Sequence, residues 1–155
     1  RALGNRSILA DPRKLEMQLK VNTAVKYRET FRPFAPAVLE ESASKIFKID
    51  KKTKVPFMEK AVLVRNSWRK KIPAVVHVDG TARVQTVNKK FNPSFYNLIN
   101  EFYKITNIPV LLNTSFNLNG EPVVMSPSDA IRTFHTCGLD TLVLQDYVIL
   151  KKINK

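Results

Sequence analysis

PSFYNLINEFYKITNIPVLLN, residues 93–113, is the stretch that most clearly determines the fold. Pro93 suits the first position of a helix, and the apolar side chains that follow recur with the i, i+3, i+4, i+7, i+8 spacing of a core-facing stripe. The stripe consists of Phe95, Leu98, Ile99, Phe102 and Tyr103. Residues 109–113 form a short apolar run, which predicts a buried strand directly after the helix. A core-facing helix followed by a buried strand is typical of an α/β domain.

Further helices are predicted outward from this stretch. Asp11 and Pro12 would open a helix over residues 12–25, with Leu15, Leu19 and Asn22 along one face. A second helix is predicted over residues 40–47. A third is capped by Ser126, with Pro127 at its first position and Asp129 in its first turn. It would end near Cys137, with Gly138 as a left-handed cap.

The predicted strands alternate with these helices. They cover residues 34–39, 61–65, 74–78, 81–87, 109–113, 141–144 and 147–151. Asp79 and Gly80 lie between two of them and are a strong hairpin signal. The expected architecture is a mixed, hairpin-containing sheet covered by a few helices.

The composition limits the class of protein. The chain has 155 residues, of which 44% are apolar, which fits one globular domain. No apolar run approaches the roughly 20 residues that a membrane span needs, so no membrane partner is expected. Cys137 is the only cysteine, which excludes an internal disulfide and makes a cytoplasmic location the default expectation. Position 1 is not methionine, so we expect the chain to be a fragment.

The net charge is +13, from 26 Lys and Arg against 13 Asp and Glu. Such an excess attracts polyanions, whether nucleic acid, an anionic membrane or phosphorylated small molecules, and composition alone does not choose among them. Part of the excess is a lysine-led cluster between residues 45 and 71. Lysine suits a solvated surface better than bidentate phosphate recognition.

The first candidate motif is RALGNRSILADPR, residues 1–13. It places Arg1, Arg6 and Arg13 around a glycine and two small polar residues. Guanidinium groups bind phosphate oxygens in a fixed fork, so the motif suits an anion. The alternative is that the arginines are ordinary surface charges.

The second candidate motif is KYRETFRPFAP, residues 26–36. In extended backbone, Lys26 and Arg28 point the same way, and Arg32 is pushed toward extended geometry by Pro33. Two cations side by side are favourable when an anion lies between them. The alternative is a solvated, basic start to a strand.

The third candidate motif is HVDGTARVQ, residues 77–85, in which Thr81, Arg83 and Gln85 share a polar face. A two-residue turn around Asp79 would pair His77 with Ala82, whereas a three-residue loop would pair His77 with Arg83. Only the second geometry builds a shared anion site, and a structural role for His77 stays open. No second His or Cys lies nearby, so no metal site is predicted.

The fourth candidate motif is NTSFNLNGEP, residues 113–122. Asn113, Ser115 and Asn117 share one side if the backbone is extended, with Phe116 opposite. They follow a buried strand, where open α/β sheets bind ligands. Asx-turn chemistry is the alternative explanation for the asparagines.

No Walker A, GxGxxG or GxSxG sequence is present, and no nucleophile with its base is evident. The motifs therefore predict an anion cradle that positions a phosphorylated substrate.

Taken in order, the four motifs resemble the C-terminal domain of the NodU/CmcH-type O-carbamoyltransferases, and the resemblance covers nearly the whole chain. It implies one domain over residues 1–155 with a YrdC-like fold, an open twisted mixed β-sheet flanked by helices. In that family a Gly-Pro normally precedes the first arginine. We therefore expect a truncated chain that lacks an N-terminal ASKHA-type domain.

The resemblance also implies substrates and site residues. ATP, with Mg²⁺, and carbamoyl phosphate would form a carbamoyl-adenylate, whose carbamoyl group passes to a hydroxyl acceptor at the N-terminal domain. Lys26-Tyr-Arg28 resembles the Lys-x-Arg signature of the YrdC fold, and Ser115-Phe-Asn117 resembles its Ser-x-Asn signature. The expected catalytic residues are Lys26, Arg28, Ser115 and Asn117. The expected substrate-binding residues are Arg6, Arg13, Arg32, His77, Asp79, Thr81, Arg83, Gln85, Asn113 and Thr114.

Two other functions stay open at this stage. The charge would suit a YrdC-like module that binds tRNA or another nucleic acid, with an affinity that falls steeply with salt. The chain could also be a non-catalytic domain whose basic face docks the missing part. The hydroxyl acceptor and the oligomeric state are not determined by this sequence.

Overall fold

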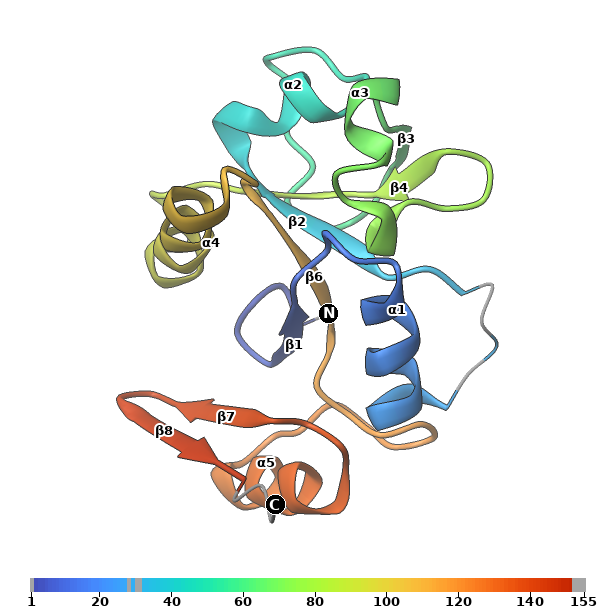
Figure 1. Ribbon diagram of the computed structural model, residues 1–155. Coiled ribbons are helices and arrows are strands. Elements are labelled where there is room, and N and C mark those ends of the chain that lie inside the picture. Colours follow the sequence, from blue (N-terminus) through green and yellow to red (C-terminus); the bar gives the residue numbers. More distant parts are fainter. Residues whose placement is uncertain (1, 28, 30–31, 152–155) are drawn as a thin grey trace.

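The computed structural model describes residues 2–27, 29 and 32–151. Its centre is a four-stranded sheet in the order β1 (Ser7–Ala10), β6 (Val110–Ser115), β2 (Ala35–Leu39) and β5 (Gln85–Val87). β6 runs antiparallel to both β1 and β2, and β5 runs parallel to β2. The expected α/β class with an open, mixed sheet flanked by helices is therefore confirmed (Figure 1).

Helix α4 (Pro93–Thr106) packs on one face of this sheet. Phe95 and Ile99 are buried against β-strand residues, as the apolar stripe predicts. Leu98 and Tyr103 remain 49% and 39% exposed, so the predicted stripe is wider than the buried face. Asn92 caps the helix by accepting a hydrogen bond from the Phe95 N–H.

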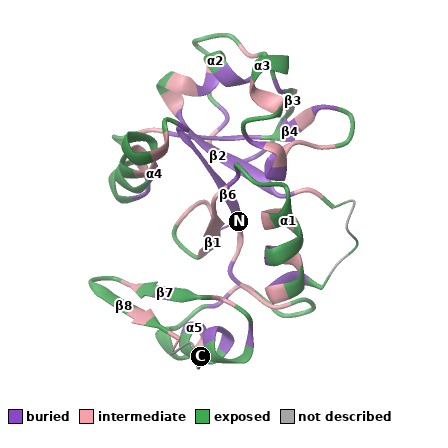
Figure 2. Ribbon diagram, in the orientation of Figure 1, coloured by how far each residue is buried: buried purple, intermediate pink, exposed green. Residues whose placement is uncertain are grey.

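The opposite face of the sheet carries the larger core. Residues of α1 (Glu16–Val21), the π-helical turn η1 (Asn22–Lys26), α2 (Ala43–Ile46) and α3 (Asn66–Arg69) pack in it. The 3₁₀ turn η2 (Glu40–Ser42) joins β2 to α2. Figure 2 shows the buried residues of β2 and of the first part of β6 at the centre of the sheet. Every residue of β2 is buried, because the strand is paired on both edges and covered on both faces.

The helix predicted over residues 12–25 starts later than expected. Asp11 accepts hydrogen bonds from the backbone N–H and the Nε of Arg13, which holds a turn in place of the first helical turn. Helix α1 therefore begins at Glu16. Leu15, Leu19 and Asn22 do lie together, but they line an open pocket of about 220 Å³ and the two leucines are mostly exposed.

The hairpin predicted over residues 74–87 is wrong. Pro73 starts the 3₁₀ turn η3 (Pro73–Val75), and Ala74 and Val75 are buried in the core. β4 (Thr81–Arg83) pairs instead with β3 (Ala61–Leu63) in an antiparallel two-stranded sheet. After Val84 the chain continues into β5, so residues 81–87 connect the small sheet to the central one.

The C-terminal segment forms α5 (Pro127–Thr136) and an antiparallel hairpin of β7 (Thr141–Leu144) and β8 (Tyr147–Leu150) (Figure 1). Ser126 and Asp129 form a reciprocal capping box, as predicted from their types. Gly138 is not the left-handed cap we expected, because α5 ends with Cys137 in extended backbone. A Cβ at Gly138 would lie 3.0 Å from the Ala24 Cβ, so the glycine permits close packing against η1.

A search of the described residues for membrane spans finds no helix with the length and apolar character needed to cross a bilayer.

Candidate functional site

A row of polar side chains marks the end of β6. Because side chains alternate along a strand, Asn113 and Ser115 point to the same face of the sheet. Phe116 is 6% exposed and lies in the larger core. Thr114 alternates with Asn113 and Ser115, so it belongs to the opposite face and is not part of this row.

The ammonium group of Lys26 joins this row from η1. Its Nζ donates to the backbone oxygens of Ser115 and Asn117, at 2.7 and 2.9 Å. It also contacts Asn117 Oδ1 at 2.8 Å and Ser115 Oγ at 3.3 Å. The Ser115 hydroxyl donates to Asn117 Oδ1 at 2.6 Å. Lys26 is only 4% exposed, so a buried cation fixes the segment that follows β6.

The backbone at Lys26 differs from the extended geometry predicted for it. Lys26 is the last residue of η1, and Tyr27 takes a left-handed conformation with φ of 45°. The extended backbone that was expected from Lys26 onward is therefore not present at Lys26 and Tyr27. Arg28 itself lies outside the described residues.

A second hydrogen-bonded chain runs across the sheet from Asn113. Asn113 Nδ2 donates to Gln85 Oε1 at 2.8 Å, and Gln85 Nε2 donates to the Leu3 carbonyl at 3.2 Å. Asn113 pairs in register with Ala35, and Gln85 with Ala37. The small alanine side chains of β2 leave room for the two long amides to meet above that strand.

Asn113 is 1% exposed, and its Oδ1 has no hydrogen-bond partner among the residues described. Buried polar atoms are usually paired, and an unpaired one costs about 1–3 kcal/mol. This oxygen is available to accept a hydrogen bond from a ligand, which supports the end of β6 as the candidate site.

The His77 loop is held by its own side chains. His77 Nδ1 lies 2.9 Å from Thr81 Oγ1, and Asp79 Oδ1 accepts from both the hydroxyl and the N–H of Thr81, at 2.7 and 2.8 Å. The His77 N–H donates to the Thr81 carbonyl, so neither predicted pairing, with Ala82 or with Arg83, occurs. Arg83 is exposed on β4. Gly80 has φ of +79° and lies against the Arg69 guanidinium.

Burial lowers the pKa of His77 below its ordinary value of 6.5; nearby Asp79 opposes this effect and Arg83 adds to it. The folded protein then binds this proton less readily than the unfolded chain does. The stabilising contribution of neutral His77 is therefore present above about pH 6.5 and is lost as the pH falls through the lowered pKa.

We expect wild type to lose more unfolding free energy than His77→Gln does when the pH is lowered from 7.5 to 5.5. Urea unfolding at the two pH values measures the difference. Asp79 does not interfere, because hydrogen bonds from Thr81 hold the pKa of Asp79 below 3.8. An identical pH dependence for the two proteins would contradict the buried, neutral state of His77.

The arginines of the first two motifs do not gather as expected. Arg6 donates to the Val124 carbonyl at 2.9 Å and so lies near the segment after Asn117. Arg13 forms an ion pair with Asp11 at 2.6 Å, beyond the other end of β1. Arg32 pairs with Glu29 at 3.8 Å on the exposed surface. Arg1 lies outside the described residues. Of Arg6, Arg13 and Arg32, Arg6 is the one that lies beside the candidate site.

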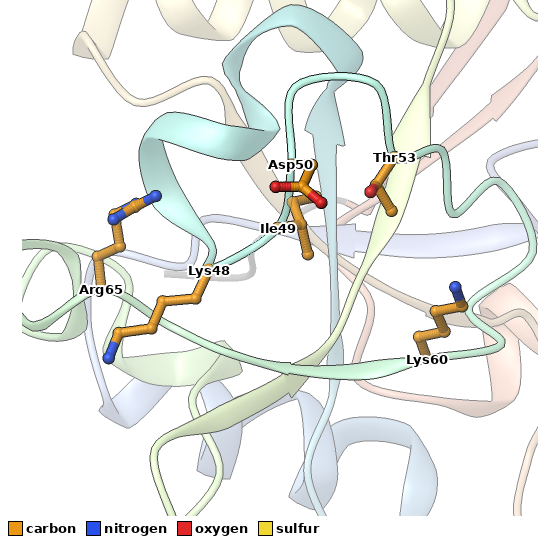
Figure 3. Close-up of a pocket in the computed structure, with 6 residues that line it drawn as sticks. All are labelled: Lys48, Ile49, Asp50, Thr53, Lys60 and Arg65. Atoms are coloured by element: carbon orange, nitrogen blue, oxygen red, sulfur yellow. The ribbon is translucent and has the colours of Figure 1, made fainter.

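The lysine-rich region forms a shallow hollow of about 510 Å³, lined by Lys48, Ile49, Asp50, Thr53, Lys60 and Arg65. Figure 3 shows the ammonium groups of Lys48 and Lys60 on opposite sides of Asp50. Arg65 Nε donates to the Ser44 carbonyl. The cations do not converge on one point, which fits the predicted solvated surface better than an anion site.

Sequence reasoning missed the contribution of the first turn of the chain. The Leu3 carbonyl accepts from Gln85 and from Asn92, and Gly4 lies against the Phe95 ring. The one sequence signal for the close approach of this turn to Phe95 was the glycine at position 4.

The described residues contain no group of three or more His, Cys, Asp or Glu side chains that could hold a metal ion.

Comparison with known proteins places the chain in a family. The family model described as "Carbamoyltransferase C-terminus" matches residues 1–151. The chain is 53% identical over 153 residues to nodulation protein NolO of Bradyrhizobium diazoefficiens, which covers 98% of this chain and 28% of the relative. It is also 53% identical over 153 residues to nodulation protein NolNO of Sinorhizobium fredii, covering 98% of this chain and 22% of the relative. Nodulation protein U of Rhizobium tropici is 47% identical over 120 residues, covering 77% and 20%.

The chain thus spans between a fifth and three-tenths of the length of these relatives. The family model matches nearly the full chain and agrees with the resemblance carried by the four motifs. The chain therefore belongs to the carbamoyltransferase C-terminus family.

Proposed function

We propose that this domain binds ATP and carbamoyl phosphate and forms a carbamoyl-adenylate, as one part of a longer O-carbamoyltransferase. The observation that carries the proposal is the contact of Lys26 with Ser115 and Asn117. These two residues lie 89 and 91 positions after Lys26 in the chain. Membership of the family makes carbamoyl transfer the reaction to which such a cluster is best suited.

The proposed reaction has two steps in this domain. Water cleaves carbamoyl phosphate to carbamate and inorganic phosphate. A carbamate oxygen then attacks the α-phosphorus of ATP, and the bond from that phosphorus to the β-phosphate bridging oxygen breaks. Pyrophosphate leaves, and carbamoyl-adenylate remains for a hydroxyl acceptor bound by the N-terminal part of the protein, which releases AMP.

The residues of the site would act by position and charge, because phosphoryl transfer depends mainly on holding and neutralising phosphate oxygens. In this proposal Lys26 supplies a fixed positive charge, and it holds the Ser115–Asn117 segment in one conformation. Asn113 hydrogen-bonds to Gln85, and Gln85 hydrogen-bonds to the Leu3 carbonyl, so these two amides would hold the Leu3 turn next to β6. Mg²⁺ would enter as the complex with the ATP phosphates.

Exchange of labelled pyrophosphate into ATP tests this proposal directly. We expect the chain to catalyse exchange only when carbamoyl phosphate is present. Ser115→Ala should lower the rate about tenfold or more, because a hydrogen bond to a charged group contributes about 1.5–3 kcal/mol. Ser128→Ala, an exposed serine in α5, is the matched control and should leave the rate unchanged.

A folded wild-type chain without carbamoyl-phosphate-dependent exchange would contradict adenylate formation by this domain. Tight, size-selective binding of tRNA at physiological salt would favour the nucleic-acid alternative, because non-specific binding through surface lysines weakens steeply with salt.

A further inference from the structure

Residues 45–71 form a lysine-rich lobe, called the lysine lobe below. Figure 1 shows its elements α2, β3 and α3 together at the end of the molecule opposite to α5. The lobe contains ten Lys and Arg against two Asp and Glu, so it holds +8 of the chain's net charge of +13. The function proposed above uses none of these residues, and the charge of the lobe is left without a role.

Most of this charge is not neutralised within the protein. Arg65 Nε donates to the Ser44 carbonyl at 3.0 Å. Arg69 Nε donates to the Val64 carbonyl at 3.2 Å, so both arginines hold the lobe together. The exposed side chains that make no ion pair with another described residue are all lysines: Lys45, Lys48, Lys51, Lys52, Lys60 and Lys70. Ammonium groups on flexible stems attract an anionic surface without requiring a fixed geometry.

These cations surround a small apolar strip on the outward face of β3. Ala61 and Leu63 alternate with a less exposed residue and are themselves exposed, Leu63 at 40%. Lys60 directly precedes the strip, and the backbone N–H of Lys48 donates to the Leu63 carbonyl at 2.8 Å. On β4 the exposed Arg83 lies opposite Ala61 and adds a further cation. Apolar side chains ringed by lysines suit a lipid headgroup layer, in which the stems enter the interface and the ammonium groups meet the headgroups.

We propose that the lysine lobe docks the protein onto a membrane surface that contains anionic lipids. Charge complementarity carries the inference, because clusters of basic residues of this size are attracted to anionic headgroups. The lack of an apolar run long enough to span a bilayer excludes a span but not this contact, which needs no membrane-spanning segment.

A nucleic acid would use the same cations, but it is recognised more often by arginine than by lysine and gains nothing from Leu63. Asp50 lies between Lys48 and Lys60 in the hollow of the lobe and opposes the attraction to either polyanion (Figure 3). The candidate site at Lys26 and Ser115 lies outside the lobe, so docking does not depend on ATP binding.

Flotation of the chain with phosphatidylcholine vesicles, with and without phosphatidylglycerol, tests the inference. We expect binding only when phosphatidylglycerol is present, and weaker binding at higher salt because the charges are screened. The double variant Lys48→Gln/Lys60→Gln should bind about tenfold more weakly or worse. Leu63→Ser, which leaves the charge unchanged, should bind about threefold more weakly. Asp50→Asn should bind more tightly.

The matched control is Lys20→Gln/Lys104→Gln, which removes the same charge from α1 and α4. Both lysines belong to exposed ion pairs, and the variant should bind nearly as well as wild type. If the two double variants lose affinity equally, binding follows the net charge alone and the inference is overturned. If Leu63→Ser binds vesicles like wild type, and wild type binds a fluorescent duplex DNA more tightly than vesicles at the same salt, the lobe is a nucleic-acid surface and the inference is wrong.

Discussion

Lys26→Met is expected to abolish carbamoyl-phosphate-dependent pyrophosphate exchange, with a loss of about 100-fold or more, because loss of a preorganised charge or donor at a reacting group has effects of that size. Methionine is similar in length to lysine, so the buried site stays filled. The charge disappears, and with it the donors to Ser115 and Asn117. The same variant should unfold at a lower urea concentration, since buried acceptors left unpaired cost about 1–3 kcal/mol.

Lys20→Met is the matched control for this experiment. Lys20 lies in α1, is 59% exposed and pairs with Asp140 at 3.3 Å. Exposed ion pairs contribute about 0–1 kcal/mol, so stability and exchange should hardly change. If Lys26→Met kept wild-type exchange, Lys26 would have no part in the chemistry and the Ser115–Asn117 segment would not depend on it.

Gly4→Ala is expected to destabilise the fold by about 2–5 kcal/mol, since overpacking contributes about 1–3 kcal/mol and left-handed backbone about 1–2 kcal/mol. Gly4 has φ of +101°, and a Cβ there would lie 2.3 Å from Cδ1 of the Phe95 ring. Phe95 is 4% exposed in the smaller core, so the ring has little freedom to move away. The turn would shift, and its Leu3 carbonyl would no longer meet Gln85.

Gly120→Ala separates the two causes. Gly120 also has positive φ, +78°, but no atom lies within 4 Å of a Cβ built there. Backbone strain alone predicts a loss of roughly 1–2 kcal/mol. Urea unfolding of both variants gives the steric contribution by difference. Equal losses would show that the Phe95 ring yields without cost, which would contradict the tight packing of the first turn.

The parts of the fold that the sequence predicted are those governed by local pattern. Helix α4 and strand β6 follow from periodicity and from Pro93, and α5 follows from Ser126 and Asp129, whose capping interactions span three residues. The wrong hairpin shows the limit of this reasoning. Residues 74–78 have strand-forming side chains, but β4 finds its partner in β3, some twenty residues earlier.

The candidate site shows the same division. Its residue types were predicted in the second and fourth motifs, but no spacing rule brings Lys26 to Ser115 across 89 residues. That proximity depends on the position of η1 beside the end of β6. The sequence also did not tell whether Arg13 binds a phosphate or forms an ion pair with Asp11, because arginine is equally suited to both roles.

The close packing of the Cys137–Gly138 segment against η1 has a practical consequence for measuring motion. Cys137 is the only thiol and is 8% exposed, with its Sγ 3.6 Å from the Phe134 carbonyl. Because the thiol is buried, a thiol-specific reagent reaches it only when the segment around Cys137 opens. The labelling rate in native buffer therefore measures how often the C-terminal segment opens by itself, and comparison with the rate in urea distinguishes this local opening from global unfolding.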